Sequence, residues 1–153
     1  MILLLPSKKI KIKSIGFVKR TSPDENVKDR TLVSRIVLKK SLTEALDGIE
    51  EFSHVFIIFL LHKILNTEET VLKIHPQGRT ELPLVGIFAT RTPVRPNPIG
   101  LTLVELVKRE ENILWVKSLD AIDGTPVLDI KPYNGWDAAV SARVPKWLIN
   151  INK

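Results

Sequence analysis

The sequence predicts a mainly β protein, a small antiparallel β-barrel with one short helix and an irregular C-terminal arm. Three observations support this fold class. Apolar residues recur at every second position through most of the chain, which is typical of strands with one buried face. Roughly eight such segments are short and separated by turn residues, as in closed all-β folds. The seven glycines form neither a G-x-G pair nor a Walker A loop, which argues against a doubly wound nucleotide-binding fold.

Eight segments have the apolar pattern of a strand. They are residues 10–17, 31–38, 54–61, 71–74, 84–89, 101–107, 113–119 and 126–130. A phase shift in the first segment predicts a bulge near Ser14. The segment 54–61 is apolar on both faces, which predicts a central buried strand. The last two segments are joined through Asp123 and Gly124, a strong turn signal, and are expected to form a hairpin.

One segment departs from the strand pattern and predicts the short helix. Ser41 and Glu44 have the spacing of a capping box, and Gly48 stands where a helix would end. The predicted helix is about two turns long. After Pro132 the pattern is lost, and an arm, a helix and a dimer contact all remain open for the tail.

Length and composition limit the class of protein. A chain of 153 residues with 44% hydrophobic and 26% charged residues fits one folded domain over residues 1–153. The absence of cysteine excludes disulfides and thiol chemistry and suits a cytoplasmic protein. The longest apolar run, Val55–Leu61, is far shorter than the roughly 20 residues that span a bilayer, so we expect no membrane segment. The net charge of +6 favours an anionic partner.

A stiff loop between residues 89 and 101 is the first candidate functional segment. Its three prolines exclude a helix and disfavour a central strand. They leave Arg91 and Arg95 little conformational freedom, and two guanidinium groups suit a carboxylate or a phosphate. A rigid connection with both arginines in solvent fits the residue types equally well.

Residues 120–133 form the second candidate segment. Their carboxylates lack the spacing of an EF-hand, and Asp123 with Gly124 would by itself be only a turn. Asp129, however, lies inside an apolar strand, where a carboxylate needs a partner or a ligand. The three histidines of the chain have no zinc spacing and no HExxH motif is present, so we expect no metal.

The third candidate segment is the apolar strand together with its end. His54 opens the strand and is expected to be a hydrogen-bonded core residue, whereas His62 and Lys63 follow it where a ligand can reach. The lysines at the N-terminus fit either a solvated face or an electrostatic footprint for RNA. They are Lys8, Lys9, Lys11 and Lys13.

Together, these segments resemble the TrmO/TsaA-like family. The motifs run from Gly48-Ile-Glu-Glu-Phe-Ser to His54, from Phe88-Ala-Thr-Arg-Thr-Pro-Val-Arg-Pro-Asn-Pro-Ile to Gly100, and from Asp123-Gly-Thr-Pro-Val-Leu-Asp-Ile-Lys-Pro to Tyr133. They keep the family's order over about residues 15–135. Family members transfer a methyl group from S-adenosylmethionine to N6 of N6-threonylcarbamoyladenosine, the modified tRNA base just 3′ of the anticodon. The resemblance implies this activity on the tRNA anticodon loop, a TsaA-like barrel and a homodimer.

The resemblance also implies a cofactor pocket at the matching positions. The implied S-adenosylmethionine-binding residues are His62, Lys63, Arg91, Leu101, Ile122, Asp123, Gly124 and Thr125. Many members have a P-R-Q triplet before the second strand, whereas this chain has Val27–Thr31 there. The cofactor contacts of that loop therefore differ, and Arg30 is the candidate substitute.

The chemistry of the acceptor adds candidate catalytic residues. The ureido nitrogen has a delocalised lone pair, so its proton must leave as the methyl group arrives. Asp123, Asp129 and Tyr133 are the candidate bases, and the sequence does not choose among them. The base must be presented from a single-stranded loop, and Tyr133 or Trp136 is expected to stack on it.

Substrate recognition is expected to involve the stiff arginine loop. The threonyl carboxylate would pair with Arg95 or Arg91, and Arg95 is preferred because Arg91 matches a cofactor contact. Asn97 and Lys131 complete the expected substrate-binding residues. Two other functions stay open because the segment around Lys28 is altered: a methyltransferase of the same fold with a different acceptor, and a noncatalytic RNA-binding barrel.

Overall fold

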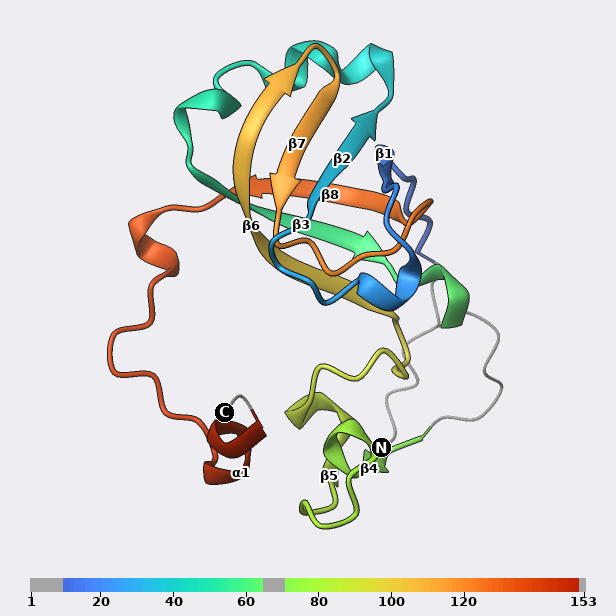
Figure 1. Cartoon of the computed structure of the whole chain (residues 1–153), viewed down its shortest axis with the longest axis vertical. Helices are drawn as coiled ribbons and strands as arrows, with labels where there is room; N and C mark the ends of the chain where they lie inside the picture. The colour runs from blue at the N-terminus through green and yellow to red at the C-terminus, as the bar shows by residue number, and fades with distance from the viewer. Residues whose placement is uncertain (1–9, 65–70, 152–153) are drawn as a thin grey trace, which may run out of the picture.

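A computed structural model describes residues 10–64 and 71–151 of the chain. Six antiparallel strands close into a barrel in the order β1-β2-β7-β6-β3-β8, which confirms the predicted fold class (Figure 1). The barrel strands are β1 (Gly16–Lys19), β2 (Val33–Leu38), β3 (His54–Leu60), β6 (Ile99–Glu110), β7 (Ile113–Lys117) and β8 (Pro126–Pro132). A separate small sheet pairs β4 (Lys73–Ile74) with β5 (Val85–Gly86).

Alternate residues of the barrel strands point into a single apolar core. In β3, Val55, Ile57 and Phe59 are buried, while the residues between them are half-buried on the outer face. β3 pairs with both β6 and β8, so the prediction of a central strand is confirmed. Branched aliphatic side chains fill most of the core, as suits a pleated surface. The side chains with no exposed area are Val18, Ile36, Val55, Ile57, Val104, Leu114, Val116 and Val127.

The first predicted strand is shorter in the structure. β1 begins only at Gly16, because its partner β2 ends at Leu38 directly opposite. Residues 10–15 are therefore not in a strand, and the bulge expected near Ser14 does not form. Lys11 and Lys13 are exposed. Lys8 and Lys9 lie outside the described residues.

The predicted hairpin between the last two strands is wrong. β7 pairs with β2 and β6, whereas β8 pairs with β1 and β3. Residues 118–125, which we call the crossover loop, therefore connect two strands that β1 and β2 separate. Gly124 still turns the chain, with a φ of 76°. A turn signal is local, and it does not determine which strand the chain joins next.

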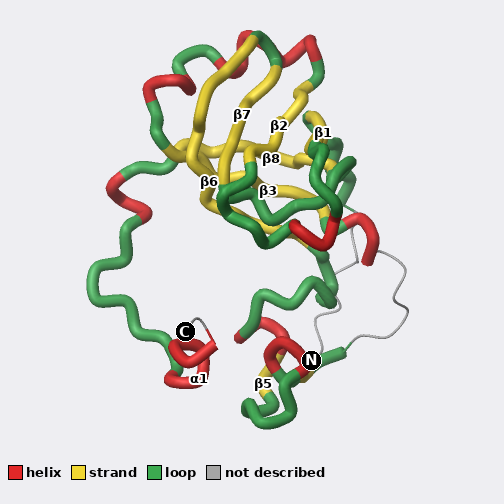
Figure 2. The backbone as a smooth tube through the Cα atoms, viewed as in Figure 1, coloured by secondary structure: helices red, strands yellow, loops and turns green. Residues whose placement is uncertain are grey.

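The helix predicted at residues 41–48 is a 3-10 helix, Lys40–Leu46, followed by a second 3-10 turn at Ile49–Glu51. Ser41 lies inside this helix rather than at its cap, so the predicted capping box does not form. Within the described residues, the α-helix is α1 (Lys146–Ile151) in the C-terminal arm (Figure 2). The remaining 3-10 turns are Asp24–Asn26, His62–Ile64, Pro76–Gly78, Ile87–Ala89 and Gly135–Asp137.

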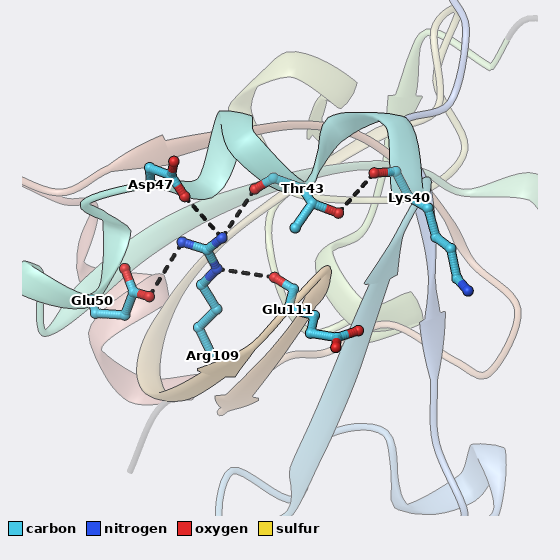
Figure 3. Close-up of polar contacts among 6 residues, drawn as sticks. All are labelled: Lys40, Thr43, Asp47, Glu50, Arg109 and Glu111. Atoms are coloured by element: carbon cyan, nitrogen blue, oxygen red, sulfur yellow. Dashed lines mark hydrogen bonds and ion pairs between the residues drawn. The ribbon is translucent and has the colours of Figure 1, made fainter.

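Arg109 attaches the 3-10 segment to the barrel at the turn between β6 and β7 (Figure 3). Its side chain is only 12% exposed. The guanidinium donates to the carboxylates of Asp47 at 3.0 Å and Glu50 at 3.2 Å. It also donates to the carbonyl oxygens of Thr43 at 3.0 Å and Glu111 at 2.9 Å. Because the group is largely buried, its three acceptors in residues 40–51 fix the position of the chain between β2 and β3.

Gly100 is required by packing, and we predict that Gly100→Ala destabilises the barrel. A Cβ atom at this position would overlap the ring of Phe59, a buried core residue. Forcing that ring aside should lower the free energy of unfolding by about 1–3 kcal/mol, measured by urea denaturation. Gly135→Ala is the matched control, because a Cβ there meets nothing within 4 Å. Equal losses in the two variants would contradict this role of Gly100.

Candidate functional site

The antiparallel order of the barrel brings four loop segments, from three of its connections, to one end. This end, which we call the loop end, has the last residues of β1, β3 and β7 and the first residues of β2, β6 and β8. Its loops are residues 20–32, 61–64, 90–98 and 118–125. Every residue that the sequence assigned to the cofactor pocket lies in these loops, apart from Leu101 at the start of β6. Arg109 and its partners lie at the opposite end.

The end of β3 contacts the proline-rich loop. The backbone N–H of Leu61 donates to the carbonyl of Pro98 at 2.7 Å, and that of Ile99 donates to Asn97 at 2.7 Å. His62 follows directly and is half-buried in its 3-10 turn. The structure therefore brings His62 and Asn97, which are 35 positions apart in the sequence, into one region.

The loop between β1 and β2 also belongs to the loop end, although it lacks the P-R-Q triplet that many family members have. The ammonium of Lys63 forms an ion pair with Asp24 at 2.7 Å. The hydroxyl of Ser118 donates to the carbonyl of Arg30 at 3.0 Å. Hydrogen bonds from Thr31 lower the pKa of the Asp29 carboxyl below its usual value. The altered segment thus lies between the crossover loop and the end of β3.

Arg20, which the sequence does not mark as a site residue, supports the crossover loop through hydrogen bonds to its backbone. It is only 7% exposed, and its guanidinium donates to the carbonyl oxygens of Leu119 at 2.9 Å and Ala121 at 3.3 Å. A lone arginine after a short strand looks like a surface residue in sequence. Its role follows from the fold, which places the loop from β7 over the end of β1.

Asp123 is held in place by β1. One carboxylate oxygen accepts a hydrogen bond from the backbone N–H of Arg20 at 2.7 Å, and the other lies 4.0 Å from the ammonium of Lys19. The backbone N–H of Gly124 donates to Val18 at 2.8 Å, which fixes the turn itself. The side chain of Asp123 is still 45% exposed. The loop end therefore presents a negative charge in a fixed position to a ligand in solvent.

Three further predicted residues share the outer face of β6, β3 and β8, which we call the motif face. Leu101 on β6 lies opposite Ile58 on β3, and Ile58 lies opposite Asp129 on β8. Two strand spacings place Leu101 and Asp129 roughly 10 Å apart. In the next row, Lys131 forms an ion pair with Asp129 at 2.9 Å, the partner expected for a carboxylate in an apolar strand, although the Asp129 side chain lies on the outer face and is 48% exposed. Leu101 is 53% exposed.

The crossover loop is also linked to the start of β6. The hydroxyl of Thr102, next to Leu101, donates to the carboxylate of Asp120. The sequence alone does not indicate this pair, because the two residues are 18 positions apart. Within the loop, Ile122 is half-buried and Thr125 is buried.

Tyr133 lies far from Asp123 within one chain. Its backbone N–H donates to the carbonyl of His54 at 3.1 Å, and its ring contacts Phe56 with centroids 5.9 Å apart. β8 advances by about 3.3 Å per residue, so its two ends are roughly 20 Å apart. Tyr133 therefore belongs to the far end of the motif face, and Trp136, which is 96% exposed, lies beyond it.

The proline-rich loop at residues 90–98, which carries Arg91 and Arg95, is ordered by threonines as well as prolines. The hydroxyl of Thr90 donates to the carbonyl of Ile87 at 2.7 Å and accepts from the backbone N–H of Thr92 at 3.2 Å. The guanidinium of Arg95 lies 6.0 Å from the centroid of the Phe88 ring, while Arg91 is exposed. The loop thus presents two cations in different environments.

Residues 10–64 and 71–151 lack two features that bear on function. This part of the chain contains no group of three or more His, Cys, Asp or Glu residues arranged to hold a metal ion. It also contains no helix with the length and hydrophobicity needed to cross a membrane. A shallow cavity of about 240 Å³ lies beside β1 and β2, and no predicted site residue lines it.

Comparison with known proteins agrees with the motifs. The family model for the tRNA-methyltransferase O N-terminal domain matches residues 12–137. A probable S-adenosyl-L-methionine-binding protein from Methanothermobacter thermautotrophicus is 43% identical over 129 residues, covering 81% of this chain and 90% of that protein. A mouse tRNA (adenine(37)-N6)-methyltransferase is 50% identical over 91 residues, covering 58% of this chain but only 20% of the mouse protein.

The fold also matches solved structures. A crystal structure of TrmO superimposes with a TM-score of 0.71 and 32% identity, covering 91% of this chain and 62% of that one. TrmO from Pseudomonas aeruginosa gives a TM-score of 0.68 and 32% identity, with 89% and 61% covered. The chain thus spans about three fifths of the length of these TrmO chains. The family model and these likenesses confirm the resemblance seen in the motifs, and the chain belongs to the tRNA-methyltransferase O N-terminal domain family.

Proposed function

We propose that this protein transfers a methyl group from S-adenosylmethionine to N6 of N6-threonylcarbamoyladenosine, next to the anticodon of tRNA. Family membership and the names of the relatives support a tRNA methyltransferase that uses this cofactor. The first motif, residues 48–54, lies at the opposite end of the barrel, where β3 begins. The observation that carries the proposal is the convergence of the second and third motifs, together with the end of β3, on the loop end and the adjoining motif face. These segments come from distant parts of the sequence, and barrel closure brings them together.

The residues of the loop end fit the chemical groups of S-adenosylmethionine. The fixed carboxylate of Asp123 suits the ribose hydroxyls or the ammonium of the cofactor, and Lys63 and Arg91 suit its carboxylate. Leu101 and Ile122 offer apolar surface for the adenine ring. When bound, the cofactor supplies the methyl group as an electrophilic sulfonium, and the residues of the chain position the acceptor and accept its proton.

Asp129 is the candidate base that the geometry favours. It lies on the motif face in the same cross-strand row as Leu101, whereas Asp123 already accepts from Arg20. Lys131, the ion-pair partner of Asp129, can pair instead with a phosphate or a carboxylate of the substrate. Asp129 is then able to accept the proton of N6.

A cytoplasmic homodimer is part of the proposal. Tyr133 and Trp136 lie far from Asp123 in one chain, so a second chain is needed to bring an aromatic stacking partner to the loop end. The motif face exposes Leu101 and, at 40%, Leu103, which gives a second copy apolar surface to cover.

Asp123→Asn tests cofactor binding without dismantling the loop. The amide oxygen of asparagine can still accept the bond from Arg20, so only the negative charge is lost. We expect S-adenosylmethionine affinity to fall by at least about tenfold in calorimetry, as for a charge-assisted contact. Glu51→Gln removes the same charge at the opposite end of the barrel and should leave affinity unchanged. Equal affinity of Asp123→Asn and wild type would remove Asp123 from the cofactor site.

Arg95→Lys tests recognition of the threonyl carboxylate. The substitution keeps the charge but loses the planar fork, so single-turnover methylation of threonylcarbamoyl-modified tRNA should slow by roughly tenfold or more, with cofactor affinity kept. Arg143→Lys, in the exposed C-terminal arm, is the control. Mass spectrometry of the tRNA nucleosides identifies the methylated base. Equal methylation of modified and unmodified tRNA by the wild type would show that the acceptor is different.

A further inference from the structure

A continuous row of three cations and one aromatic ring crosses the outer face of four barrel strands, on the other side of the barrel from β8 and β3. Lys19 on β1 lies opposite Arg35 on β2, Arg35 lies opposite Trp115 on β7, and Trp115 lies opposite Lys108 on β6. We call these four residues the cation row. Neighbouring strands are about 4.8 Å apart, so the row is roughly 14 Å long. None of its members belongs to the three motifs.

Trp115 holds the two cations beside it. The guanidinium of Arg35 lies 5.3 Å from the centroid of the indole ring, and the ammonium of Lys108 lies 4.5 Å from it. Both distances suit a cation–π contact, which restricts two long side chains that would otherwise sample many rotamers. Trp115 therefore acts as a positioning residue, and the charges themselves remain at the surface.

The charges of the cation row are accessible. The side chains of Lys19 and Lys108 are 50% and 49% exposed. Lys108 also contacts Glu110, and this hydrogen bond lowers the pKa of the Glu110 carboxyl. The adjoining row adds Lys117, which lies opposite Glu105. Ion pairs between exposed side chains, such as that of Lys108 with Glu110, are weak. An RNA phosphate can therefore replace the carboxylate as the partner of the lysine at a small cost in free energy.

We propose that the cation row binds the phosphate backbone of the RNA whose base is methylated at the loop end. The row begins at Lys19, whose ammonium is 4.0 Å from Asp123 in the crossover loop, so a strand that follows the row arrives at the candidate cofactor site. Its length suits a few successive phosphates of one strand. The identity of this RNA as tRNA rests on the proposed function, whereas the phosphate contacts depend only on the row.

The double variant Arg35→Gln with Lys108→Gln tests this surface. Its matched control is Lys73→Gln with Lys146→Gln, which removes the same charge from β4 and α1, at the other pole of the molecule (Figure 1). The probe is a fluorescein-labelled RNA anticodon stem-loop, titrated by fluorescence anisotropy at several salt concentrations. We expect the row variant to bind roughly tenfold more weakly and to reduce the salt slope by about 1.5, because two phosphate contacts are lost. The control should change neither by more than about twofold.

A positioning role for Trp115 is tested with the same probe. Trp115→Leu keeps every charge and should also weaken binding, whereas Trp115→Phe keeps an aromatic face and should restore most of it. Urea denaturation of each variant separates loss of binding from loss of folding. If the row only stabilises the sheet, the variants would lower the free energy of unfolding but leave the affinity and salt slope of the folded protein unchanged, which would overturn the proposal.

The outcomes separate this inference from the proposed function. If the wild type methylates tRNA but the row variant and its control bind the stem-loop equally, the cation row is not the RNA surface. If the row variant loses affinity and salt slope but the wild type binds no S-adenosylmethionine and methylates no tRNA, the RNA surface stands and the proposed function fails. The single variant Arg35→Lys keeps the charge and should bind nearly as the wild type does.

Discussion

The hydrogen bonds between β1 and β8 close the barrel, and both the core and the candidate site depend on this seam. The seam is short, with only Gly16 and Phe17 in register with β8. Backbone bonds extend it beyond the ladder, from Ile15 to Val127 at 2.8 Å and from Val18 to Thr125 at 2.9 Å. A Cβ at Gly16 would overlap the backbone of β2, so the close approach of β1 to β2 beside the seam requires glycine there. The same contacts fix the crossover loop. Closure of the barrel and the geometry of the candidate site therefore depend on the same hydrogen bonds.

This arrangement replaces the glycine-rich loop and helix N-terminus by which many enzymes bind a nucleotide cofactor. The described loop end has no long helix and instead gains rigidity from side chains that bond to backbone. Arg20 supports two carbonyl groups of the crossover loop, and Arg109 supports the segment at the other end of the barrel. A guanidinium can serve several acceptors at once, which suits a fold in which loops, not helices, meet at the site.

The sequence predicted the barrel and most of its strands, because alternation along one strand is a local property. It did not predict which strands pair, and the expected hairpin across Asp123 and Gly124 was therefore wrong. The short helix lies where it was predicted but is a 3-10 helix, and its capping box does not form, since Ser41 has the spacing of a cap but not the position of one. The motif residues were found because their order is characteristic of a family. Arg20 and the cation row were not, because only the fold brings their partners within reach.

The central claim is that S-adenosylmethionine binds where the loops converge, and NMR of the ¹⁵N-labelled protein tests it most directly. On titration with the cofactor, the amide resonances of residues 61–63, 97, 99–101 and 122–125 should shift together and saturate at one affinity. Amides around Glu50 and Glu111, at the opposite end of the barrel, should remain in place. Shifts confined to that opposite end, or no saturable shifts at any concentration that the cofactor reaches, would contradict the account.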